Sequence, residues 1–288
     1  MGPAIIAANA RAKPAGVSRA AMRRVLFPVA SMPFPLPLPD VPLAALVASP
    51  LIVLVGYTIF GATGFGSSAI SVPGLAHFFP LTFTVPLITT TDAFAATATA
   101  YRYRHHVAWR EFGRLIPAML IGMTIGATLL INLPRDPALL ALGVFVTAYG
   151  AYVLIGPRRL ANAPGWLAWP IGVVGGVFSA LFGTGGPIYM MFLSSRLDDK
   201  GTLRATSAIV VGTSIWIRLV LFLATGLLVD RTLFAMVLLL LPFELIGLFL
   251  GNRLHHALTR SGVFRLIAGL LVINGVTLIA RAVEAMRH

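Results

Sequence analysis

Long apolar stretches separated by short polar segments dominate the chain. Eight of them approach the roughly 20 residues that an α-helix needs to cross the hydrocarbon core of a bilayer. They are Val41–Phe60, Pro86–Ala100, Leu115–Leu133, Ala138–Ile155, Trp166–Phe182, Ala205–Leu228, Leu233–Leu250 and Val263–Ala280. This pattern predicts an all-α integral membrane protein with about eight transmembrane helices. Composition agrees, because only 11% of the residues are charged, whereas a soluble domain carries about 25%.

One arrangement of proline and glycine occurs twice within these stretches. The first copy has Pro117, Gly122 and Gly126, and the second has Pro242, Gly247 and Gly251, so that both fit P-x4-G-x3-G. The G-x3-G spacing places two glycines on one face of a helix, where a neighbouring helix can approach closely. We therefore expect both helices to pack tightly within the bundle.

Two glycine-rich segments interrupt the apolar pattern, and they also form a pair. They read Gly64-Phe65-Gly66-Ser67-Ser68 and Gly183-Thr184-Gly185-Gly186-Pro187. Such segments fit broken or re-entrant helices, whose unwound backbone survives in a bilayer only where protein or a water-filled cavity satisfies it. The free N–H groups at the start of a half-helix carry a partial positive charge that suits an anion.

The paired motifs divide the chain into two halves. We expect a flexible, basic, proline-rich tail over residues 1–40, a first transmembrane repeat over 41–156 and a linker over 157–165. A second repeat over 166–281 and a short C-terminal tail over 282–288 would follow. Each half would hold four helices and open with a glycine-broken helix. Internal duplication in an apolar chain is typical of secondary transporters, whose binding site lies between the repeats.

The basic residues leave the orientation open. If each half crosses four times with its termini inside, Lys and Arg favour the inside by 14 to 7, with five of the 14 in the tail, and the repeats are parallel. If each glycine-rich segment instead adds a crossing and the termini lie outside, 12 Lys and Arg residues lie inside and 9 lie outside, or 12 and 4 when the tail is left out. The repeats are then inverted. Loop placement and anionic headgroups account for the net charge of +13, so we expect no nucleic-acid partner.

Several kinds of chemistry are excluded or unsupported. The chain has no cysteine, and it contains no metalloprotease, nucleophile-elbow or Walker-type motif. We therefore expect no catalytic residues, no bound metal and no cofactor. A transporter without a nucleotide motif would be driven by an ion gradient or by the gradient of its own solute.

The paired motifs carry a resemblance to a known family. With its two glycine-rich segments, with Gly212-Thr213-Ser214 and with the paired P-x4-G-x3-G helices, the chain resembles the sulfite exporter TauE/SafE family of membrane transporters over about residues 41–281. The resemblance implies a permease of two related halves that moves small sulfur-containing anions such as sulfite and sulfonates. Ser67 and Ser68 stand where this family's pattern would have further glycine, which changes the polarity of the site.

Few charged side chains occur within the apolar stretches. Arg218 is flanked by apolar residues, and a charge in that setting is costly and usually functional. It is also a natural bidentate partner for an oxyanion, although it could instead form a structural ion pair with Glu244 or extend its side chain to the membrane interface. Glu244 has a second interpretation as a proton carrier, because burial favours the protonated carboxyl. Asp92 could bind a coupling cation or proton, or it could cap a broken helix.

The expected substrate site combines the two interruptions with nearby hydroxyls and Arg218, and Asp92 and Glu244 are the expected ion-coupling residues. Small hydroxyls also commonly bond within their own helix or across to a neighbour, which is the alternative role for them. The substrate-binding candidates are Gly64, Gly66, Ser67, Ser68, Gly183, Thr184, Gly185, Gly186, Thr91, Thr213, Ser214 and Arg218.

These observations predict a secondary transporter for a small anion, either sulfite or an organosulfonate. It would lie in the bacterial inner membrane as a multi-pass protein and work by alternating access between two repeats. The expected partners are a small anionic solute and membrane lipid, and the sequence is compatible with a homo-oligomer. The alternatives are a small-anion channel and a membrane-embedded enzyme. The lack of a histidine within the spans beside a serine or threonine argues against the enzyme.

Overall fold

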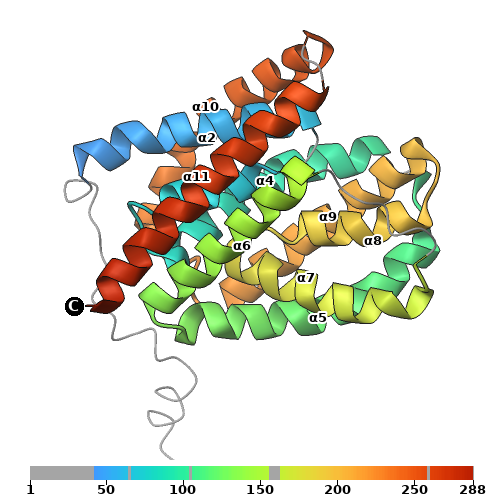
Figure 1. Ribbon diagram of the computed structural model, residues 1–288, viewed down its shortest axis with the longest axis horizontal. Helices are drawn as coiled ribbons and strands as arrows, with labels where there is room; N and C mark the ends of the chain where they lie inside the picture. Colours follow the sequence, from blue (N-terminus) through green and yellow to red (C-terminus); the bar gives the residue numbers. More distant parts are fainter. Residues whose placement is uncertain (1–41, 64–65, 104–105, 156–162, 258–259, 288) are drawn as a thin grey trace, which may run out of the picture. The chain divides into compact units, whose positions relative to one another are not determined.

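The computed structural model describes residues 42–63, 66–103, 106–155, 163–257 and 260–287. These residues form ten α-helices, one short 3-10 helix η4 (Gly165–Leu167) and no strand, which confirms the all-helical prediction (Figure 1). The expected tail and Gly64 lie outside the described residues. The α-helices are α2 (Leu43–Thr63), α3 (Ser67–Leu75), α4 (Leu81–Tyr103), α5 (Trp109–Asn132), α6 (Arg135–Ile155), α7 (Ala168–Phe182), α8 (Gly186–Arg196), α9 (Lys200–Ala224), α10 (Arg231–Ala257) and α11 (Arg260–Arg287).

Seven segments in the described part are long and apolar enough to cross a membrane, so the predicted count of eight spans is not confirmed. They lie in α2, α5, α6, α7 with η4, α9, α10 and α11. The eighth predicted span corresponds to α4, which is 23 residues long but rich in threonine and carries Asp92. Helix α11 continues to Arg287, past the point where the second half was expected to end.

Helix α9 turns apolar side chains outward and polar side chains inward. In α9, Trp216, Val220 and Leu223 are exposed, whereas Ser214 and Arg218 on the opposite face are buried. This arrangement reverses that of a soluble helix, and it fits a protein whose solvent is hydrocarbon. The polar side chains of α9 at Ser214 and Arg218 are therefore directed into the interior.

Helices α3 and α8 are short and fold back along the helices that precede them. A Cβ placed on Gly74 of α3 would lie 2.8 Å from Ile52 of α2, while the start of α3 lies beside Gly56. At the other interruption, the last residue of α8 returns to the start of α7, where Arg196 Nη1 donates to the carbonyl of Ala163 at 3.1 Å. In each pair the short helix therefore packs back along the helix that precedes it in the chain.

Close glycine crossings join α5 to α7 and α10 to α2. A Cβ on Gly126 of α5 would lie 2.5 Å from the carbonyl oxygen of Val177, and a Cβ on Gly247 of α10 would lie 2.7 Å from that of Leu54. In both crossings the contacts advance along the two helices together, so the paired helices run parallel. The prediction that the P-x4-G-x3-G glycines mediate tight packing is confirmed.

Two other helix pairs run antiparallel. Thr97 in α4 accepts a hydrogen bond from Trp216 Nε1 in α9, and the backbone N–H of Ala108, beyond the end of α4, donates to Thr206 near the start of α9. In α6 and α11, Gly143 packs on Gly275 and Gly150 packs on Ala268. The short helix α3 packs mainly on α2, α4 and α11, and the short helix α8 packs mainly on α7 and α9.

Candidate functional site

The two glycine-rich interruptions lie next to each other. Gly183 ends α7 with φ 73°, and Gly66 precedes α3 with φ 100°; both values lie in the left-handed region that favours glycine. A Cβ on Gly183 would lie 3.0 Å from the Ser68 side chain and 3.1 Å from Arg218 Nη1. The N-terminus of α3, the segment that leads into α8 and the Arg218 guanidinium therefore meet at one centre.

Asp92 occupies the N-terminus of α3. Its carboxylate accepts hydrogen bonds from the hydroxyls of Tyr57 at 2.7 Å, Ser67 at 2.9 Å and Ser68 at 2.5 Å. The Tyr57 hydroxyl also lies 2.8 Å from the Thr91 hydroxyl. Hydrogen bonds to a carboxylate are stronger than those between neutral groups, so these three hydroxyls hold the Asp92 side chain in place. Asp92 is therefore tied to the first two residues of α3 through their hydroxyls, and its role as helix cap or ion-coupling residue stays a prediction.

Arg218 lies in the interior without an ion-pair partner. Its side chain is 2% exposed, and Nη1 donates to the carbonyl oxygen of Ser179 at 2.9 Å. Its Nε atom is buried without a hydrogen-bond acceptor. No carboxylate of the described residues comes within 4.0 Å of the guanidinium, so the Arg218–Glu244 ion pair that the sequence allowed is not formed. The Asp92 carboxylate is nevertheless close enough to attract the Arg218 guanidinium electrostatically.

Hydroxyls gather around the start of α8. The Ser179 and Ser214 hydroxyls lie 2.7 Å apart. The Tyr189 hydroxyl lies near both serines and within electrostatic range of Arg218, but it makes no hydrogen bond of good geometry. The Thr184 hydroxyl, in the interruption itself, is also buried without a partner. Buried polar atoms are normally hydrogen-bonded, so the two unpartnered hydroxyls and the Arg218 Nε are three donors that an acceptor could satisfy.

The two interruptions therefore differ in charge. The N-terminus of α3 already faces the Asp92 carboxylate, whereas α8 begins beside a cation and hydroxyl donors without a carboxylate partner. A helix N-terminus with a guanidinium and hydroxyls is suited to an oxyanion. The arrangement can hold an anion at the second interruption.

Comparison with known proteins identifies the family. The family described as Sulfite exporter TauE/SafE matches residues 49–278. The chain belongs to this family. The chain also aligns over 173 residues, at 31% identity, with the probable inner membrane transporter protein TsaS of Comamonas testosteroni. The aligned part makes up 60% of this chain and 72% of that protein. No solved structure matches it significantly. This TauE/SafE member is a multi-pass membrane transporter of the bacterial inner membrane.

The remaining predicted residues are placed as follows in this TauE/SafE protein. Gly185 lies so close to α7 that an added Cβ would be 2.5 Å from the Gly175 carbonyl, and Gly186 begins α8. Thr91 contacts Tyr57 as described above, and Thr213 is half-buried beside Ser214. Glu244 is 1% exposed, and its carboxyl lies within electrostatic range of Asp92 and Tyr57.

Three residues at the centre were not predicted from the sequence. Tyr57, Ser179 and Tyr189 each lie in an apolar segment, where an isolated hydroxyl is common and carries little signal. The sequence signal that could have found them is their distance along the chain from the two interruptions. Tyr57 lies seven residues before Gly64, Ser179 lies four residues before Gly183, and Tyr189 lies three residues after Gly186. A residue one or two turns from a helix break faces the break, because helical residues three and four apart share a face.

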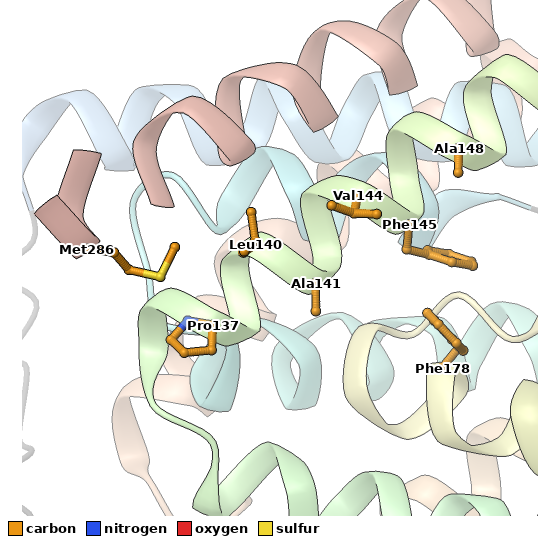
Figure 2. A pocket seen from close by; sticks show the side chains of 8 residues that line it. All are labelled: Pro137, Leu140, Ala141, Val144, Phe145, Ala148, Phe178 and Met286. Atoms are coloured by element: carbon orange, nitrogen blue, oxygen red, sulfur yellow. The ribbon is translucent and has the colours of Figure 1, made fainter. Parts of the chain in front are cut away.

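A separate apolar groove of about 450 Å³ lies between α6, α7 and α11. Figure 2 shows that the side chains around it come mainly from α6. No polar side chain lines it, so it does not suit an anion. Its lining consists of Pro137, Leu140, Ala141, Val144, Phe145, Ala148, Phe178 and Met286.

Proposed function

We propose that this protein is a secondary transporter that moves one small anion, of the sulfite or organosulfonate class, by alternating access between two repeats. It performs no covalent chemistry. The observation that carries the proposal is Arg218, a buried guanidinium with no ion-pair partner among the described residues, which lies beside the interruption that opens α8. An unpaired charge within a span is costly, and a bound anion would offset that cost.

The proposed repeats are inverted, with α2–α6 corresponding to α7–α11. Parallel repeats would make corresponding helices run in the same direction, but α4 runs against α9 and α6 runs against α11. The glycine crossings support the same correspondence, because α5 packs on α7 just as α10 packs on α2. The anion site would then lie where the two re-entrant hairpins meet, which is typical of transporters with inverted repeats.

The inverted arrangement also favours one orientation. It places the loops after α4, α6, α8 and α10 on one side of the membrane, and outside the N-terminal tail that side has 12 basic residues against 4 on the other. By the positive-inside rule these loops face the cytoplasm. The described termini at α2 and α11 then face the opposite side.

The test is anion flux in proteoliposomes, scored by counterflow of radiolabelled sulfite and methanesulfonate. Counterflow requires a carrier, so its absence together with rapid downhill flux would identify a channel. Removing a charged hydrogen-bond donor costs about 1.5–3 kcal/mol, so Arg218→Gln should weaken anion binding by roughly 10- to 100-fold. Arg218→Lys, which keeps the charge but loses the planar fork, should have an intermediate effect.

Melting temperatures of both variants are the control for folding. Loss of flux at an unchanged melting temperature is the expected result. Full flux and wild-type affinity in Arg218→Gln would remove Arg218 from the anion site and overturn the proposal.

A further inference from the structure

The two buried carboxyl groups near the centre differ in their hydrogen bonding. Asp92 has three hydroxyl donors and the start of α3, so its negative charge is well stabilised. Glu244 is 1% exposed, and its Oε2 atom is buried without a hydrogen-bond partner. Neither Lys nor Arg of the described residues lies within 4.0 Å of it. A buried carboxylate without donors is unfavourable, whereas the neutral acid is tolerated.

The surroundings of Glu244 increase this difference. Helix α10 packs on α2 and α4, and the titratable groups that face Glu244 from these helices are Tyr57 and Asp92. An ionised Glu244 would therefore meet repulsion from the Asp92 carboxylate and no cation among the groups that face it from α2 and α4. A proton on Glu244 removes this repulsion.

The charges of the centre can be summed with Glu244 in each state. Each helix N-terminus contributes about half a positive charge, Arg218 contributes one, and Asp92 subtracts one. With Glu244 protonated, the centre has a surplus of about one positive charge. With Glu244 ionised, the centre is close to neutral. Only the protonated centre has a charge that one monovalent anion would balance.

We propose that Glu244 takes up one proton when the centre binds one monovalent anion, so that the two are carried together. This inference rests on the proposed function and adds the coupling ion and the residue that carries it. It assigns a fixed charge to Asp92 and an exchangeable proton to Glu244. Sodium is a poorer candidate, because both Asp92 oxygens already accept hydroxyl hydrogens and a metal cation needs several free oxygen ligands.

The decisive measurement is the affinity for methanesulfonate as a function of pH, with protein purified in detergent. Methanesulfonate stays ionised across the range, so any dependence on pH comes from the protein. For one linked proton, the dissociation constant should rise by about tenfold per pH unit on the alkaline side. In Glu244→Gln, which is permanently neutral, binding should remain tight and independent of pH. Glu284→Gln is the matched control, because Glu284 is exposed in α11, and it should keep the wild-type slope.

Calorimetry in buffers of different ionisation enthalpy supplies a direct count, with one proton expected per anion in the wild type and none in Glu244→Gln. In proteoliposomes, Glu244→Gln should retain anion counterflow but lose accumulation driven by a pH gradient. Binding of methanesulfonate by the wild type with no pH dependence and no proton uptake would overturn the inference and leave the anion site standing. A requirement for sodium would also overturn it. Absence of binding at every pH, for sulfite as well, would instead count against the proposed function.

Discussion

The crossing of α5 over α7 gives a quantitative prediction. In Gly126→Ala the new methyl group would lie 2.5 Å from the Val177 carbonyl oxygen and 2.9 Å from the Ala180 methyl group. Neither atom can rotate away, since one belongs to the backbone and the other is a Cβ. The two helices must therefore separate, and overpacking of this kind costs about 1–3 kcal/mol.

Alanine also stabilises a helix relative to glycine by about 1 kcal/mol, so the cost must be measured against a control on the same helix. Gly113 lies in α5 with open space around its Cβ position, and Gly113→Ala reports the gain in helix propensity alone. Gly126→Ala should therefore be less stable than Gly113→Ala by about 1–3 kcal/mol.

The assay is thermal unfolding of the purified variants in detergent. At about 2–4 °C per kcal/mol for a chain of this size, Gly126→Ala should melt roughly 2–12 °C below Gly113→Ala. Gly126→Leu should show a larger deficit. Equal melting temperatures for the two alanine variants would refute the close crossing, and a higher value for Gly126→Ala would show that α5 and α7 have space between them.

Two further predictions concern stability. Ser68→Ala removes a donor to the Asp92 carboxylate and should lower the unfolding free energy by about 1.5–3 kcal/mol. Ser71→Ala is the control in the same helix, and it should cost much less because the Ser71 hydroxyl has no hydrogen-bond partner. Similar losses of stability in the two variants would contradict the Ser68–Asp92 hydrogen bond. Asp199 caps α9 by accepting the Thr202 N–H at 2.7 Å, and this bond lowers the pKa of its carboxyl. The stabilisation is present above about pH 4 and disappears as the pH falls through the lowered pKa, so the melting-temperature deficit of Asp199→Ala should vanish in acid.

Sequence alone predicted the features that depend on residue type at fixed spacing. The glycines of P-x4-G-x3-G predicted close packing, because no larger residue allows such an approach. The glycine-rich segments predicted interruptions, because glycine tolerates the left-handed backbone found at Gly66 and Gly183. Burial of Arg218 followed from its apolar neighbours in the chain.

Features that depend on which helices meet were not predictable. The sequence could not tell that Ser68 would approach Gly183, or that Asp92 would take both neighbouring serine hydroxyls, since these contacts join α3 to α4 and to the α7–α8 turn. The relative direction of the halves was likewise open, because basic residues in the tail and the loops supported different schemes. The antiparallel contacts of α4 with α9 support the inverted arrangement proposed above.

The parallel pairing of α2 with α10 has a consequence for biogenesis. The Leu54 carbonyl meets its partner Gly247 only after about 190 further residues are made, a delay of roughly 10–40 s at ordinary rates of translation. During that interval the surface of α2 that will receive Gly247 must be covered by lipid or by the insertion machinery. Synthesis of α10 then displaces this temporary cover, so a helix made late in synthesis secures one made much earlier.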